Sequence, residues 1–213
     1  MSRAICIMGE SGSGKTTSLR NLPPEETYYI DCDKKGLSWK GWRSQYNAQK
    51  KNYKATDDAE RIQSILSGIS ERCPHIRYVA IDTLNGIMVG DEMRRMKEKG
   101  YDKWVELASC VWELVDGAYS YREDLTLIFT AHSQTERDDS GYFFTRIKTN
   151  GRKLEKVVLE SKFTTVLLAK AAGGRYFFET RAQNSTCKTP MGAFPSDQID
   201  NDIMLVLEAL KEY

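Results

Sequence analysis

The sequence lacks long hydrophobic runs and lacks an excess of charge of one sign. Its first apolar run, Ala4–Met8, is short, and no stretch of the 213 residues approaches the roughly 18 apolar residues that a membrane helix needs. The 31 basic and 30 acidic residues leave a net charge of +1. We therefore expect no membrane partner, and any nucleic-acid site has to be a local patch.

Paired cysteines are absent as well. The five cysteines are odd in number, lie far apart and form no CxxC pair: Cys6, Cys32, Cys73, Cys110 and Cys187. This pattern favours reduced thiols and a cytoplasmic location. Cys73 and His75 are close in sequence, but no second pair of ligands stands at metal-binding spacing, so we expect no zinc site.

The composition favours one globular domain over residues 1–213. Hydrophobic residues make up 40% of the chain, which argues against disorder, and the length allows a sizeable core to be buried. Short β-branched or aromatic runs alternate with helical stretches, as in an α/β fold whose mainly parallel sheet is flanked by helices. Strands are predicted over residues 3–8, 27–32, 78–81 and 125–131, and helices over 15–22, 57–70, 84–99, 103–122 and 197–211.

Three further expectations concern details of these elements. Pro23 and Pro24 should end the first helix, and Thr56 should cap the second. The runs 163–169 and 176–180 predict a β-hairpin across Gly173 and Gly174, at the end of the sheet. Residues 133–152 are polar, and we expect a mobile loop there around a short strand at 142–147.

A phosphate-binding motif follows the first predicted strand. It fits G-x-x-x-x-G-K-[ST] at every fixed position: Gly9, Glu10, Ser11, Gly12, Ser13, Gly14, Lys15 and Thr16, with Thr17 next. The backbone N–H groups and the positive end of the predicted helix should hold the phosphates of ATP. Lys15 should contact the β- and γ-phosphates, and the Thr16 hydroxyl should bind Mg²⁺.

Polar residues at three other strand ends are candidates for the remaining chemistry. Asp82 follows an apolar strand and is assigned to the magnesium shell, although it could instead cap the next helix. Asp33, with Asp31 in reserve, is the candidate general base or water-positioning group. His132 is the candidate sensor of the γ-phosphate, against the alternative of an ordinary surface histidine.

The order of these segments resembles that of RecA-like recombinase ATPases. More narrowly, the chain is similar to the small phage-encoded ATP-binding proteins built from a RecA core alone, a group linked to single-strand annealing and homologous recombination. The resemblance implies a RecA-like P-loop NTPase fold, ATP dependence, binding of single-stranded DNA and cooperation with a single-strand-binding protein in a bacterial host cytoplasm. RecA itself has a glutamate at the position of Asp33 and a glutamine at that of His132.

The same resemblance suggests a shared active site. Glu179-Thr180-Arg181 and Lys188 resemble the RecA segment that carries basic residues into the ATP site of the neighbouring subunit. We therefore expect a homo-oligomer in which Arg181 or Lys188 acts on the neighbour's γ-phosphate. The alternative is that Arg181 pairs with Glu179 or with another surface acid.

Two segments are candidates for DNA contact. Residues 34–56 carry seven basic residues, no acid and interleaved aromatics (Trp39, Trp42, Tyr46 and Tyr53), which could stack on bases or pack under the domain edge. Residues 133–152 occupy the place of a RecA DNA-binding loop and, with the residue that follows, carry Arg137, Arg146, Lys148, Arg152 and Lys153.

Other functions remain open at this stage. A small-molecule P-loop kinase has about this length, but no compact arginine cluster suggests its lid. A nucleotide-gated DNA-binding or loading module with little hydrolysis fits the same motifs. An AAA+ protein is disfavoured, because the roughly thirty residues after Thr180 are too few for a helical lid.

Overall fold

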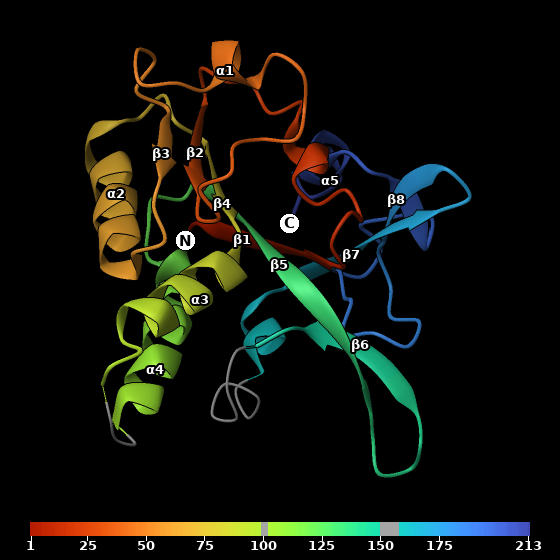
Figure 1. The fold of residues 1–213 in the computed structure, drawn as a ribbon. Coiled ribbons are helices and arrows are strands. Elements are labelled where there is room, and N and C mark those ends of the chain that lie inside the picture. The colour runs from red at the N-terminus through yellow and green to blue at the C-terminus, as the bar shows by residue number, and fades with distance from the viewer. Residues whose placement is uncertain (99–101, 150–157) are drawn as a thin grey trace.

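The computed structural model describes residues 1–98, 102–149 and 158–213 (Figure 1). Within these residues, nine strands form one sheet in the order β3-β2-β4-β5-β1-β7-β8-β9, and β6 pairs with β5. The strands are β1 (Arg3–Gly9), β2 (Thr27–Asp31), β3 (Tyr53–Ala55), β4 (Tyr78–Asp82), β5 (Thr126–Arg137), β6 (Phe143–Ile147), β7 (Thr165–Ala172), β8 (Arg175–Glu179) and β9 (Gln198–Asp200). The pairs from β3 to β7 along this order are parallel, whereas β7-β8, β8-β9 and β5-β6 are antiparallel.

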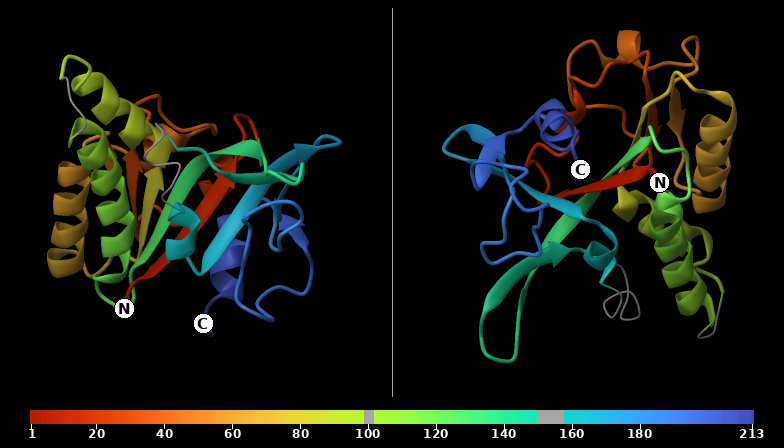
Figure 2. Two further views of the ribbon diagram at one scale, coloured as in Figure 1. Left: turned by 90° about the horizontal axis from the view of Figure 1, so that it is seen from below. Right: turned by 180° about the vertical axis from the view of Figure 1, so that it is seen from behind.

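Helices cover both faces of the sheet. On one face lie α2 (Ala59–Arg72), α3 (Leu84–Arg94) and α4 (Asp102–Asp116); on the other lies α5 (Ile203–Ala209), as Figure 2 shows. Successive side chains of β1 enter opposite cores: Cys6 and Met8 pack with α2 and α3, and Ile5 and Ile7 pack with α5. The predicted α/β fold, with a mainly parallel sheet flanked by helices and a C-terminal hairpin, is confirmed.

Several predicted boundaries were wrong. The helix predicted over 15–22 is a 3-10 turn, η1 (Thr17–Leu19). Ser18 Oγ donates to the Lys15 carbonyl and Arg20 Nη1 to that of Thr17, so side chains take the acceptors that a longer helix would use. Asp58, not Thr56, caps α2 by accepting from the Arg61 N–H.

The C-terminal helix is shorter than its sequence indicates. It begins at Ile203 behind the cap Asp202, because Gln198–Asp200 instead forms β9 on β8. The part of the chain described after Thr180 thus holds only this seven-residue α-helix.

Two hairpins extend from the carboxyl ends of the central strands. Strand β5 continues to Arg137 and pairs with β6, so the predicted mobile loop over 133–152 is an ordered hairpin as far as Ile147. Arg152 and Lys153 lie outside the described residues. The predicted β7-β8 hairpin is confirmed, with φ of 59° at Gly173 and 75° at Gly174, values that favour glycine. It lies toward one end of the sheet, with only β9 beyond β8 in the described part of the chain, but β7 pairs with β1 and so brings the hairpin beside the P-loop of its own chain.

The basic and aromatic segment 34–56 folds over the edge of the sheet, where it forms α1 (Trp42–Gln45) and β3. Its rings pack on one another and on Tyr29: Trp39, Tyr46 and Tyr53 each lie within 6.5 Å of the Tyr29 ring centroid. Arg43 covers the Trp42 ring at 4.7 Å. Of the two alternatives for these aromatics, the structure therefore favours packing under the domain edge.

The five cysteines are free thiols. Among the described helices, none combines the length and apolar character that a membrane span requires.

Candidate active site

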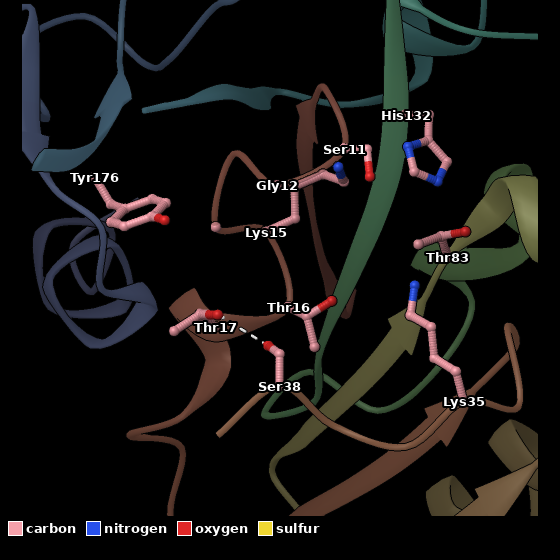
Figure 3. A pocket seen from close by; sticks show the side chains of 11 residues that line it. Ser11, Gly12, Lys15, Thr16, Thr17, Lys35, Ser38, Thr83, His132 and Tyr176 are labelled. Atoms are coloured by element: carbon pink, nitrogen blue, oxygen red, sulfur yellow. Dashed lines mark hydrogen bonds between the residues drawn. The ribbon is translucent and has the colours of Figure 1, made fainter. Parts of the chain in front are cut away.

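One cavity at the carboxyl end of the sheet gathers half of the predicted site residues. Its volume is about 390 Å³. It is lined by Ser11, Gly12, Gly14, Lys15, Thr16, Thr17, Lys35, Ser38, Thr83, His132 and Tyr176 (Figure 3). These residues come from the P-loop (Gly9–Thr16), from the segments that follow β2 and β4, and from β5 and β8.

The P-loop bends through glycines that other residues could not replace without strain. Gly12 and Gly14 have φ of 80° and 92°. A Cβ on Gly9 would lie 2.5 Å from Ser13 Oγ and 2.7 Å from the Ala169 carbonyl oxygen. Because the helix that follows is only η1, the phosphates would be held by the loop's N–H groups and by Lys15 rather than by a helix dipole, contrary to the sequence-based expectation.

The Lys15 ammonium lies inside the loop. It donates to the carbonyls of Gly9 at 2.8 Å and Glu10 at 2.7 Å. Burial lowers the pKa of Lys15 to about 8, although the nearby carboxylate of Asp82 acts in the opposite direction. A cation held only by two carbonyls in a buried position would gain from an anionic ligand in the cavity.

Asp82 is the most heavily bonded polar side chain of the site. Its Oδ2 accepts from Thr16 Oγ1 at 2.8 Å and from Tyr29 OH at 2.7 Å, and its Oδ1 accepts from Thr130 Oγ1 at 2.5 Å. The carboxylate, at the end of β4, therefore joins the P-loop to the interior of β2 and β5. The alternative role of helix cap belongs to Thr83, whose hydroxyl accepts from the Gly86 N–H.

Asp33 stands one contact behind the cavity wall. Its Oδ2 lies 2.5 Å from Lys35 Nζ, and its Oδ1 accepts from Thr83 Oγ1 at 3.2 Å. The reserve candidate, Asp31, is buried, and its Oδ2 accepts from Tyr53 OH and from the Gly36 N–H, both at 2.7 Å. Asp31 thus holds the loop in place and is not open to the cavity.

His132 lines the cavity directly opposite the start of the P-loop. Its Cα is paired with that of Gly9 across the β1-β5 ladder, and its N–H donates to Asn85 Oδ1 at 2.7 Å. Burial and then the positive charge of Lys15 lower the pKa of His132, so the neutral ring is favoured. This position fits the predicted contact with a terminal phosphate.

Arg181 and Lys188 do not line this cavity. Arg181 forms an ion pair with Asp197 at 2.8 Å and donates to the Phe194 carbonyl, the surface pairing that stood as the alternative. The backbone of Lys188 pairs with Val166 near the start of β7. Their action on a neighbouring subunit stays a prediction.

Two residues beside Gly14 were missed from the sequence. Tyr176 is half exposed and lies over Gly14, where an added Cβ would come within 2.9 Å of its ring. Asn201 contacts the same glycine position, and its buried Nδ2 has no partner. The Gly173-Gly174 turn was a visible signal for the hairpin, but only the β1-β7 pairing brings Tyr176 to the P-loop of its own chain.

Comparison with known proteins gives a matching family and finds similar solved structures. A family model described as an AAA domain matches residues 1–188. No curated protein matches the sequence. The crystal structure of a KaiC-like protein, PH0186, from Pyrococcus horikoshii OT3 is similar with a TM-score of 0.45 at 11% identity, over 83% of this chain and 76% of that one. The family match goes against the sequence-based preference, which disfavoured AAA proteins for want of a helical lid.

We predict that ATP affinity falls as the pH is raised above about 8, the pKa of Lys15 in the free protein. Bound phosphates would stabilise the ammonium and raise this pKa, so that binding takes up a proton wherever the free protein has lost it. Affinity should be highest below that pH and fall by up to about tenfold per unit above it. Titration of a fluorescent ATP analogue across this range measures the effect.

The control for this prediction is Lys15→Ala. It should keep the parent's circular dichroism but lose most of its ATP affinity at neutral pH, because the loop would then carry no cation. Parent-like affinity in the folded variant would contradict the assignment of the P-loop.

We also predict that Tyr176→Ala weakens the binding of ATP but not that of inorganic triphosphate. The ring lies at the end of the cavity away from Lys35 and His132 (Figure 3), where a base could stack on it. Loss of such stacking costs about 1–3 kcal/mol. Isothermal titration of both ligands makes the comparison, and Tyr176→Phe should behave as the parent. Equal weakening of both ligands would mean that Tyr176 supports the loop and not the base.

Proposed function

Since the chain belongs to the AAA domain family, we propose that it binds and hydrolyses ATP at the P-loop cavity and couples hydrolysis to single-stranded DNA. The observation that carries the ATPase part is the convergence of Lys15, Thr16 and His132 on the cavity, with the Asp82 carboxylate in hydrogen-bond contact with Thr16. These groups supply the parts that phosphoryl transfer to water requires: a phosphate cradle, hard oxygen ligands and a polar contact for the terminal phosphate. The proposed role in recombination or strand annealing, with a single-strand-binding protein, follows from the resemblance to RecA-core proteins.

The residues present fit a magnesium ion. The Thr16 hydroxyl and the Asp82 carboxylate lie in hydrogen-bond contact, and both are the hard oxygen donors that Mg²⁺ prefers. Within the described residues, no cluster of three or more histidine, cysteine or acidic side chains forms a complete metal site. Thr16 and Asp82 would therefore hold the ion together with water and phosphate oxygens, and its charge would stabilise the phosphates.

Asp33 is the proposed base for hydrolysis. Of the three acids at the strand ends it is the one not committed to the core, since Asp82 accepts three hydroxyl groups and Asp31 fixes its own loop. A water oxygen would attack the γ-phosphorus while a proton passes from the water to Asp33. The bond from the γ-phosphorus to the bridging oxygen breaks, and its electron pair leaves with ADP.

The β5-β6 hairpin is the proposed DNA contact. It projects from the body of the molecule (Figure 1) and exposes the rings of Tyr142 and Phe143 near its turn. Arg137 lies over the Phe143 ring at 5.6 Å, so a cation and stacking faces occur together. The hairpin continues the strand that carries His132, which links the proposed DNA contact to the nucleotide cavity.

We predict that Asp33→Asn retains ATP affinity but loses about 10²–10⁴-fold in turnover, because an amide fills the same space without accepting a proton. Steady-state hydrolysis and ATP titration separate the two effects. Asp82→Asn should instead shift the magnesium dependence. Normal turnover in Asp33→Asn would move the role to Glu10, the other acid at the loop. ATP binding without hydrolysis in the parent would leave the nucleotide-gated module as the function.

We predict that single-stranded DNA stimulates hydrolysis and that the double variant Tyr142→Ala, Phe143→Ala abolishes the stimulation. Each lost stacking contact should cost about 1–3 kcal/mol of DNA binding. Hydrolysis with and without oligonucleotide, together with fluorescence anisotropy, measures both effects. Tyr213→Ala is the matched control, because Tyr213 is an exposed aromatic on another part of the surface. An unstimulated parent would remove DNA from the proposal and leave the ATPase.

A further inference from the structure

Lys35 is the cation of the cavity wall that no sequence motif singled out. It lies two residues after Asp33, and its side chain is 57% exposed. Figure 3 shows its ammonium end directed into the cavity toward Thr83, on the side of Thr16 and His132. Lys15 and Lys35 thus face the same space from opposite walls.

The backbone around Lys35 fixes this direction. Lys34 has a φ of 57° and Gly36 a φ of 81°, so the chain turns sharply on both sides of Lys35. The buried carboxylate of Asp31 holds the turn by accepting from the Gly36 N–H. As a result Lys34 points away from the cavity, where its ammonium lies 2.8 Å from Asp57. Neighbouring lysines therefore have separate surroundings.

In the free protein Lys35 forms an ion pair with Asp33, the proposed base. Its Nζ lies 2.5 Å from Asp33 Oδ2, while Thr83 donates to the other oxygen of Asp33. Both oxygens of the carboxylate are engaged, and the lysine stands between Asp33 and the cavity. A water molecule could be activated by Asp33 only after Lys35 has moved.

The charges around the cavity favour such a movement when an anion enters. The positive charge of Lys35 contributes to the lowered pKa of Lys15 and of His132, after the larger effect of burial on each. Phosphate groups between the two lysines would relieve this repulsion. They would also offer the Lys35 ammonium a partner more highly charged than one carboxylate.

We propose that Lys35 is a catalytic residue that acts within its own chain. When ATP binds, the Lys35 ammonium moves away from Asp33 and contacts the γ-phosphate oxygens. This inference rests on the proposed ATPase function. The ammonium neutralises the charge on the γ-phosphoryl oxygens while water attacks the phosphorus, the freed Asp33 takes the water's proton, and the bridging oxygen departs with ADP. Lys35 remains protonated throughout, and the proton taken up by Asp33 passes to solvent, so each turnover consumes one water and releases one ADP, one phosphate and that proton.

The test compares Lys35→Ala with Lys34→Ala, its neighbour that points away, and with Lys35→Arg, which keeps the charge. Lys35→Ala should lose about 10²–10³-fold in kcat, as expected for one donor removed from a developing phosphoryl charge. It should also lower the ratio of ATP affinity to ADP affinity and weaken the binding of ADP with aluminium fluoride. Lys34→Ala should match the parent in DNA-free hydrolysis, and Lys35→Arg should restore part of the turnover.

Two results would overturn the inference: a kcat for Lys35→Ala within about threefold of the parent's, or an unchanged ratio of ATP to ADP affinity. Failure of the underlying function looks different, because the parent itself would then hydrolyse no ATP. In that case the affinity ratio of parent and variant still decides whether Lys35 contacts the terminal phosphate.

Discussion

The buried carboxylate of Asp82 is the interaction on which the site depends. Three hydroxyl groups donate to it, from the P-loop at Thr16, from β2 at Tyr29 and from β5 at Thr130. A buried charge is tolerable only when hydrogen bonds replace its lost hydration, so these three donors are needed together. Burial and then the negative charge of Asp82 raise the pKa of Tyr29 well above its usual value, which keeps its hydroxyl a donor.

Tyr29 connects Asp82 to the aromatic residues at the edge of the sheet. Its ring packs against Trp39, Tyr46 and Tyr53. The hydroxyl of Tyr53 donates to Asp31, which in turn accepts from the Gly36 N–H. The aromatic residues after β2 thereby position the turn that carries Lys35, and a segment whose composition suggested DNA contact supports the nucleotide cavity.

The sequence was sufficient for the parts of the site that are local. The P-loop, Asp82 and His132 each follow an apolar strand, and parallel strands bring their ends together. Tyr29 and Tyr176 could not be found this way, because their partners are set by strand order and not by nearby residues. The direction of the Lys35 side chain depends on the left-handed backbone conformation of Lys34, which precedes it. Gln198–Asp200 has no strand signal in its sequence, and only its pairing with β8 makes it a strand. Polar Ser133–Arg137 was assigned to a loop because only the pairing with β6 makes it a strand.

The continuity of β5 has a thermodynamic consequence. Strand residues run without interruption from Thr126 in the core, through His132, to Arg137 at the hairpin turn, where the Asp138 side chain accepts from the N–H groups of Ser140 and Tyr142. A ligand that binds there contacts a backbone that is already ordered. Binding therefore avoids most of the loss of conformational entropy that ordering a flexible loop would require. Weak individual contacts can then yield measurable affinity. Because β5 has no break between the hairpin turn and His132, a displacement of the hairpin would be transmitted along the strand to the position beside Gly9.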